Sequence, residues 1–394
     1  MSPSRVAIVL YRDDATSGGS LRVGETIANN LDPGRIEAHL VFAYGEPGGV
    51  SENAKVNVHH LRARSSKDLP RWFLARALFK KLKPDIIHFV DPVNWIAIAT
   101  LGIGAKHLLH FHGRPITRLM TLSDRCLMRA RRRFCDGFVG ITCGAINSAI
   151  EAGFADPRCS WTVYNGVDLE FFEKLPPKEA AREALKLPQS AKLIGQVARL
   201  VSYNGGPELL DVLSLLPEEW QAVFVGDGPF RAELQELGRE KGLDNKVHFT
   251  GALEDVRPAY ASLDAVALMA RYQSFCFMIA EAMASGVAVF GLLGDGEYTE
   301  SPNPLIAADN SVFVVRADPQ DYESIESPEV VEKLAKKIAE FGRHPEGFSG
   351  MIETAHGHVR ERFSARQQSE SITRVYFELI GSNEFERVGI EQLV

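Results

Sequence analysis

Continuous apolar runs recur along the first half of the chain, and each is followed by a turn and a longer stretch with helical spacing. The runs are Val6–Leu10, Ala38–Ala43, Asp85–Val90, His107–Phe111 and Gly137–Thr142. The helical stretches between them cover about residues 21–31, 71–82, 95–103 and 116–134. Strands covered by helices on both faces read as unbroken apolar runs. The pattern therefore predicts a right-handed, doubly wound parallel sheet.

The second half repeats this alternation after a polar, proline-rich segment, Lys174–Lys178. Its expected strands are Leu193–Val197, Gln221–Val225, Val247–Phe249, Ala265–Met269 and Val287–Phe290, with later helices over about 328–341 and 365–379. We predict an α/β protein with two Rossmann-like domains, residues 1–170 and 171–364, and a helix in 365–394 that returns to the first domain. Ligands of such folds bind beyond the carboxyl ends of the strands, so we expect the site in a cleft between the two sheets.

Charge is distributed unevenly between the halves. Residues 1–165 hold 22 Lys and Arg against 14 Asp and Glu, while the remainder holds 22 against 37. An excess of positive charge in the first half favours an anionic partner there, such as lipid headgroups or a phosphorylated acceptor. Charges spread over an ordinary solvated surface are the alternative.

The five cysteines show no metal-ligand or C-x-x-C spacing, which is typical of free thiols in a reducing cytosol. Val6–Tyr11 reads as a short strand and not as a signal peptide, and the weakly polar stretch 95–105 is too short to cross a bilayer. We expect a cytoplasmic protein, with peripheral contact at the inner face of the membrane as an open alternative.

Several short motifs follow one another along nearly the whole chain. They are Gly18-Gly-Ser-Leu-Arg-Val23, Tyr164-Asn-Gly-Val-Asp168, Val197-Ala-Arg-Leu-Val201, Val225-Gly-Asp-Gly-Pro229, Phe249-Thr-Gly251 and Glu281-Ala-Met-Ala-Ser-Gly286. Each motif alone is common, but their order and spacing resemble those of retaining glycosyltransferase family 4. That resemblance implies the GT-B fold and a nucleoside-diphosphate sugar, UDP-linked or GDP-linked, as donor substrate rather than a resident cofactor.

Two of the groups expected to contact the donor diphosphate follow the family, and a third position departs from it. Gly18 and Gly19 precede a helix, where backbone N–H groups face phosphate. Arg199 follows an expected strand, and its guanidinium suits a diphosphate; the resemblance implies that it neutralises the leaving group. The family places a lysine five residues further on, where this chain has Asn204, so one cation is missing.

The family's E-x7-E pattern falls on Gln273 and Glu281. The resemblance implies that Glu281 binds the ribose hydroxyls, whereas a favourable charge near a helix start is the alternative. Gln273 stands near the donor sugar in place of a glutamate and cannot offer negative charge to an oxocarbenium ion. Phe277 and Met278 begin the following helix, so either their backbone N–H groups face the diphosphate or their side chains pack in the core.

His112 follows the run His107–Phe111 and matches the family histidine that contacts the donor sugar. A neutral imidazole there hydrogen-bonds a hydroxyl near neutral pH. We assign catalytic roles to Arg199, His112 and Gln273. No D-x-D element or histidine ligand set is present in the sequence, so we expect no metal.

Two basic stretches alternate cations with apolar residues: Phe79–Lys83, and the segment carrying Arg118, Arg125, Arg129, Arg131, Arg132 and Arg133. They suit either a membrane surface or a solvated helix face. No nucleic-acid recognition motif accompanies them.

We expect sugar transfer to an acceptor hydroxyl with retention of configuration, in polysaccharide, glycolipid or glycosylated natural-product biosynthesis. The acceptor, a sugar, a lipid-linked molecule or a small molecule, is expected near Gly18, Gly19 and His112. Two alternatives stay open: a sugar-nucleotide epimerase of the same fold, and a sugar-nucleotide-binding protein with little or no activity, as Asn204 and Gln273 suggest.

Overall fold

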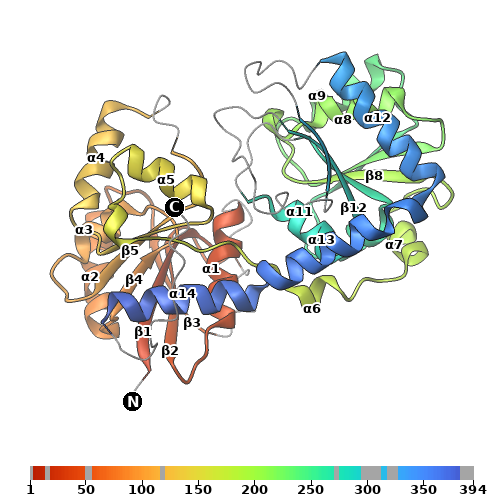
Figure 1. Cartoon of the computed structure of the whole chain (residues 1–394). Helices are drawn as coiled ribbons and strands as arrows, with labels where there is room; N and C mark the ends of the chain where they lie inside the picture. The colour runs from red at the N-terminus through yellow and green to blue at the C-terminus, as the bar shows by residue number, and fades with distance from the viewer. Residues whose placement is uncertain are drawn as a thin grey trace. The chain divides into compact units, whose positions relative to one another are not determined.

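The chain folds into two compact units (Figure 1), seen in a computed structural model that describes residues 3–13, 18–48, 56–115, 120–269, 275–293, 312–316 and 327–381. The first unit holds the chain up to Gly166 and again from Ser364, and the second holds Val167–Phe363. The sequence pattern placed the boundary between the two domains a few residues later, after residue 170. Within the first unit, the Gly166 N–H donates to Gln368 Oε1 at 3.0 Å. Within the second, the Val167 N–H donates to the Phe363 carbonyl at 2.8 Å.

The first unit is built on a parallel sheet in the order β3-β2-β1-β4-β5-β6-β7. Its strands are β1 Ser4–Arg12, β2 Ile36–Tyr44, β3 Asn57–Ala63, β4 Ile86–Phe89, β5 Lys106–Phe111, β6 Gly137–Gly140 and β7 Ser160–Thr162. Val6–Leu10 are fully buried, as the apolar run predicts. Sequence patterns missed β3 and β7, because these edge strands contain polar residues and lack a continuous apolar run.

The second unit holds a parallel sheet in the order β10-β9-β8-β11-β12-β13. Its strands are β8 Lys192–Val197, β9 Trp220–Val225, β10 Val247–Gly251, β11 Ala265–Leu268, β12 Ala288–Leu293 and β13 Phe313–Arg316. In both sheets the strand order reverses beside the first strand of the unit, which is the switch point where doubly wound folds bind ligands. The predicted pair of doubly wound parallel sheets is confirmed.

Helices alternate with the strands in both units (Figure 1). Those of the first unit are α1 Gly18–Asn30, α2 Leu69–Leu82, α3 Asn94–Ala99, α4 Leu122–Arg132, α5 Cys143–Glu151 and α14 Ala365–Leu379. Those of the second are α6 Leu169–Phe172, α7 Lys178–Ala184, α8 Gly206–Leu215, α9 Arg231–Glu240, α10 Arg257–Ser262, α11 Phe277–Ala284, α12 Pro328–Arg343 and α13 Ser349–Arg362. The expected helix over 95–103 is shorter than predicted and ends at Ala99, before a turn that contains Gly102.

An aspartate immediately before a strand fastens the start of the neighbouring strand at three places. Asp85 precedes β4, and its N–H and carboxylate bond the carbonyl and N–H of Arg5, each at 2.8 Å. Asp136, before β6, makes the same two hydrogen bonds with the backbone of His107. Asp264, before β11, makes them with the backbone of Leu193. We call the ends where the strands begin the amino edges of the sheets, and the opposite ends the carboxyl edges.

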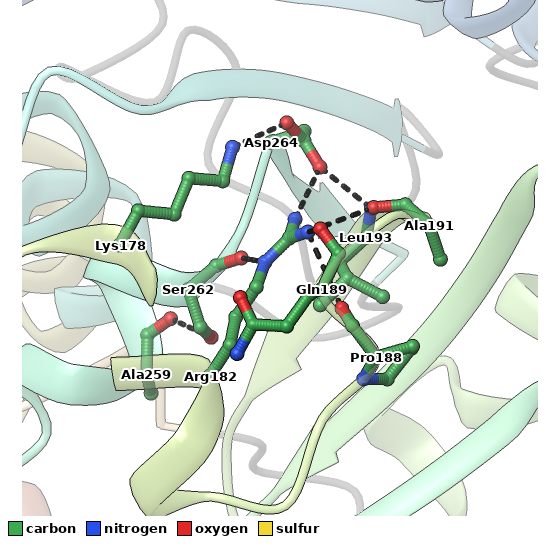
Figure 2. Close-up of polar contacts among 9 residues, drawn as sticks. All are labelled: Lys178, Arg182, Pro188, Gln189, Ala191, Leu193, Ala259, Ser262 and Asp264. Carbon is green, nitrogen blue, oxygen red and sulfur yellow. Dashed lines mark hydrogen bonds and ion pairs between the residues drawn. The ribbon is translucent and has the colours of Figure 1, made fainter. Parts of the chain in front are cut away.

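Arg182 closes the amino edge of the second sheet (Figure 2). Its buried guanidinium donates to Asp264 at 2.9 Å and to the carbonyls of Ser262, Gln189 and Ala191 at 2.7–3.0 Å, with a longer contact to Pro188. Lys178 bonds the other oxygen of Asp264. A buried cation is tolerated because its donors are satisfied, so this network has a structural role.

The last described helix, α14, completes the first unit and lies across its strands (Figure 1). Ser364 and Gln367 form a capping box at its start, which satisfies two backbone N–H groups. Ile372, Val375 and Tyr376 are buried on its inner face, and α14 packs against α1. The chain therefore returns to its first sheet after the second unit has ended.

Candidate functional site

Arg199 and Asn204 lie at the carboxyl edge of the second sheet. Arg199 follows β8 by two residues and is exposed. The Asn204 side chain donates to the Arg199 carbonyl at 2.7 Å, and the Gln196 side-chain amide in turn contacts the Asn204 carbonyl. No carboxylate of the described residues forms an ion pair with Arg199. Its backbone is held while its guanidinium faces solvent, as an anion-binding group requires.

Two glycines allow the chain to pass tightly around this segment. A Cβ on Gly226, which has a φ of +136°, would lie 2.1 Å from the Ala198 carbonyl oxygen. One on Gly205, with a φ of +81°, would lie 1.8 Å from the Met269 oxygen. The motif Val225-Gly-Asp-Gly-Pro229 therefore has a packing reason here, because its backbone supports the segment that carries Arg199.

The start of α11 lies against the end of β8. The Met278 sulfur accepts from the Val197 N–H at 3.2 Å, so the side chain of Met278 is part of the packing, while Phe277 is the first helical residue. Cys276 precedes the helix in the left-handed region at a φ of 58°, and burial raises the pKa of its thiol to about 12. Gln273 lies outside the described residues, so its predicted role stays a prediction.

Glu281 is buried within α11 and accepts a hydrogen bond from the Tyr260 hydroxyl at 2.6 Å. Tyr260, on α10, is itself fully buried and was not identified from the sequence. A carboxylate held by a phenol is oriented for a further hydrogen bond. Ribose binding by Glu281 stays a prediction.

In the first unit, Gly18 and Gly19 begin α1 and His112 follows β5 directly. Because β1, β4 and β5 are parallel neighbours, these residues share the carboxyl edge of the first sheet. His112 Nε2 lies 2.8 Å from the Val90 carbonyl oxygen, so this nitrogen carries the proton and donates it. Burial lowers the pKa of His112, with the nearby Asp91 carboxylate opposing the shift.

A second group of ionisable residues lies at the same edge. Asp13 follows β1, is fully buried and contacts His60 Nε2 at 2.9 Å. Burial, with a further contribution from Asp13, raises the pKa of Glu25 on α1 to about 7. These residues were not among the site residues predicted from the sequence. The signal was the acidic residue directly after the first apolar strand.

The predicted basic surface needs one correction. Arg131 is buried and does not face solvent: its guanidinium stacks over Phe89 at 4.8 Å and donates to Asn94 at 2.7 Å. Its neighbours on α4 are exposed or half-buried, as are Leu122, Leu127 and Phe134. Arg118 lies outside the described residues.

Two kinds of feature are absent from the described part of the chain. None of its helices is long and apolar enough to cross a membrane. No group of three or more His, Cys, Asp or Glu side chains in these residues is arranged to hold a metal ion.

Family models match most of the chain in two consecutive pieces. Residues 17–171 match the model described as Glycosyltransferase Family 4. Residues 177–299 match the model described as Glycosyl transferases group 1. The matched pieces include every predicted site residue in both units.

Curated relatives include several bacterial mannosyltransferases. A GDP-mannose-dependent alpha-mannosyltransferase of Corynebacterium glutamicum is 28% identical over 227 residues, 55% of this chain and 52% of the relative. The lipopolysaccharide core mannosyltransferase LpsB of Rhizobium meliloti is 30% identical over 170 residues, 39% and 48% of the two chains. The chain thus spans about half the length of these relatives. A GDP-mannose-dependent alpha-mannosyltransferase of Mycobacterium tuberculosis is 29% identical over 68% of this chain and 74% of the relative.

Solved structures resemble the whole fold at low sequence identity. Anabaena HepE in complex with UDP-glucose superposes with a TM-score of 0.79 at 19% identity, over 95% of this chain and 99% of HepE. WaaG, a glycosyltransferase of lipopolysaccharide biosynthesis, superposes with a TM-score of 0.67 at 16% identity, over 94% and 99%. Together with the two family models, these likenesses show that the chain belongs to glycosyltransferase family 4 and has the GT-B fold.

Proposed function

We propose that the protein transfers a sugar from a nucleoside-diphosphate sugar to an acceptor hydroxyl, with retention of configuration and without a metal ion or resident cofactor. The observation that carries the proposal is the carboxyl edge of the second sheet. There an exposed guanidinium, Arg199, and the start of α11 lie at the ends of adjacent strands. A cation and a helix amino terminus together suit a diphosphate.

Arg199 and the backbone N–H groups of Phe277 and Met278 would stabilise the charge released when the bond between sugar and phosphate breaks. Glu281 would hold the ribose hydroxyls. The acceptor hydroxyl attacks from the same face as the leaving phosphate, which takes the acceptor proton. Because the acceptor attacks the sugar directly, no protein nucleophile takes part. Gly18, Gly19 and His112 of the first unit would bind the acceptor and contact the donor sugar.

The donor is UDP-linked or GDP-linked. The relatives described as GDP-mannose-dependent and the HepE complex with UDP-glucose support these two nucleotides. Titration calorimetry of the full chain with UDP, GDP, UDP-glucose and GDP-mannose tests the choice. We expect one nucleotide series to bind with micromolar affinity. A chain that binds none of the four overturns the proposal.

Product analysis tests the reaction itself. We expect mass spectrometry to show an acceptor enlarged by one sugar, and NMR coupling constants to show the same anomer as in the donor. An inverted product contradicts retention. Incubation without an acceptor separates the competing epimerase, which would convert the nucleotide sugar into its epimer.

One observation favours a second candidate, a sugar-nucleotide-binding protein without turnover. Asn204 stands where the family has a lysine, and its amide is engaged with the Arg199 carbonyl, so it adds no charge to the diphosphate site. Donor binding without product would support this candidate. Activity gained by Asn204→Lys with Gln273→Glu would show that the two residues silence the site.

We also propose that the first unit contacts the cytoplasmic face of a membrane that carries the acceptor, in glycolipid or polysaccharide synthesis. Exposed apolar residues of α4 lie among arginines, as at a lipid interface. We expect sedimentation with phosphatidylglycerol vesicles, lost on Arg129→Glu with Arg133→Glu. Lys336→Glu, on the second unit, is the control. Equal sedimentation of all three proteins contradicts the proposal.

A further inference from the structure

Three buried side chains, those of Tyr376, His88 and His110, are joined by hydrogen bonds in a row from α14 to β5 in the first unit. We call this row the file. The Tyr376 hydroxyl lies 2.7 Å from His88 Nδ1, and His88 Nε2 lies 3.1 Å from His110 Nδ1. The three residues are at most 3% exposed. They come from α14, β4 and β5, so the file joins the end of the sequence to the middle of the first sheet.

The file continues into the predicted site by ring stacking. The ring of His110 lies 4.8 Å from that of His112, at an interplanar angle of 23°. His112 Nε2 is fixed as a donor by the Val90 carbonyl. In the neutral ring, Nδ1 of His112 is therefore the nitrogen with a free lone pair, able to accept a hydrogen bond from a sugar hydroxyl.

Burial keeps these imidazoles uncharged. It lowers the pKa of His88 to about 3 and that of His110 well below its ordinary value, and nearby histidines add to both shifts. Their charge is thus the same throughout the neutral range. What remains variable is which nitrogen of each ring carries the proton.

The number of buried polar groups left without a partner selects one pair of tautomers for His88 and His110. If the Tyr376 hydroxyl donates to His88 Nδ1, then His88 Nε2–H donates to His110 Nδ1, and only the N–H at His110 Nε2 lacks a partner among the described residues. If the direction is reversed, His110 Nε2 has an unpaired lone pair and the Tyr376 O–H also loses its acceptor. The first arrangement leaves fewer buried groups unsatisfied. The phenol of Tyr376 therefore sets the direction in which the hydrogen bonds of the file donate.

We propose that Tyr376 is a positioning residue for His112: its hydroxyl fixes the tautomers of His88 and His110, and the His110 ring so fixed holds His112 with Nδ1 available to the donor sugar. Without the hydroxyl, the two arrangements of His88 and His110 leave the same number of unpaired polar groups. The dipole of the ring stacked on His112 then reverses between molecules. This inference rests on the proposed function, because it assigns His112 to the sugar of the donor.

The first test is the variant Tyr376→Phe, which keeps the ring and removes the hydroxyl. In protein labelled with ¹⁵N-histidine, long-range ¹H–¹⁵N correlation spectra distinguish the two tautomers of each ring. We expect one tautomer each for His88 and His110 in the parent and a mixture in the variant. Thr373→Val is the matched control, because it removes a buried α14 hydroxyl that bonds only its own helix.

The second test isolates the sugar end of the donor. Calorimetry with UDP against UDP-glucose, and GDP against GDP-mannose, gives the affinity that the sugar adds. We expect Tyr376→Phe to reduce that increment about fivefold, the equivalent of one hydrogen bond, with the nucleotide alone unchanged. His88→Leu, which breaks the file at its centre, should act in the same direction. A merely structural defect would weaken nucleotide and nucleotide sugar alike.

The outcomes separate the two hypotheses. Unchanged tautomers in Tyr376→Phe, or changed tautomers with an unchanged sugar increment, overturn the positioning role. A parent that binds no nucleotide overturns the proposed function and, with it, the link from His112 to the donor, while the spectra still decide whether Tyr376 fixes the file.

Discussion

The amino and carboxyl edges of the second sheet each carry an arginine, and the two differ in burial and in hydrogen-bond partners. Arg182 at the amino edge is buried, and it donates to a carboxylate and several carbonyls (Figure 2). Arg199 at the carboxyl edge is exposed, and only its backbone carbonyl is held, by Asn204. A guanidinium with all its partners supplied by the fold stabilises the fold. One held by its backbone alone is available to a ligand.

Arg182→Met should give the largest effect. The variant removes one of the donors to Asp264 and the side-chain donor to several carbonyls, so we expect the free energy of unfolding of the second unit to fall by about 3–5 kcal/mol. Urea unfolding followed by tryptophan fluorescence measures it. Any loss of nucleotide affinity in the folded variant should be slight. A stable Arg182→Met protein that no longer binds nucleotide would reverse the comparison.

Arg199→Ala should show the opposite profile. We expect kcat to fall by about 100-fold to 1,000-fold, because one cation facing the leaving phosphate is lost. The urea midpoint should stay that of the parent. Arg199→Lys keeps the charge without the planar fork and should recover part of the rate. An Arg199→Ala enzyme with parental kinetics contradicts the assignment.

Asp136→Ala extends the comparison to the amino edge of the first sheet. The variant removes the acceptor for the His107 N–H and for Lys106, so we expect a loss of about 1–2 kcal/mol in the free energy of unfolding of the first unit. Glu219→Ala, which breaks an exposed pair with Lys192, is the control and should change stability by less than about 0.5 kcal/mol. Equal losses in both variants would mean that the fastening aspartates act only as surface charges.

Glu25 is the carboxyl-edge counterpart, and its effect appears only as a dependence of stability on pH. Its pKa is raised from 4.5 to about 7, so the folded state holds a proton that the unfolded state has released. Stability from this group therefore falls as the pH rises from about 4.5 to about 7 and is constant on either side. Glu25→Gln should remove that part of the decline, measured by urea unfolding at about pH 5 and about pH 8. An identical decline in parent and variant contradicts the assignment.

The sheets could be predicted because their central strands are unbroken apolar runs. Val6–Leu10 and Ala265–Leu268 lie fully buried where the pattern placed them. The edge strands β3 and β7 could not be predicted, because most of their residues are exposed or only partly buried and sequence patterns record burial rather than pairing. The fastening aspartates were visible in the sequence, but their function depends on the neighbouring strand.

The site could be predicted only as far as motifs fix local backbone. Arg199 and His112 lie at the ends of strands, as expected. The buried Arg131 shows the limit: a run of arginines looks uniform in sequence, and only the packing of α4 on Phe89 separates it from its neighbours. His88 and His110 were likewise visible as polar residues inside apolar runs. Their partner Tyr376 lies 288 residues from His88 and could not be inferred locally.

The return of α14 to the first sheet has a consequence for synthesis on the ribosome. The first unit cannot finish folding when its sheet has emerged, because Tyr376 and the apolar face around it are translated after the whole second unit. Until then the surface that α14 covers is open to water and to other nascent chains. We therefore expect this protein to depend on chaperones between the emergence of its first unit and that of its last helix.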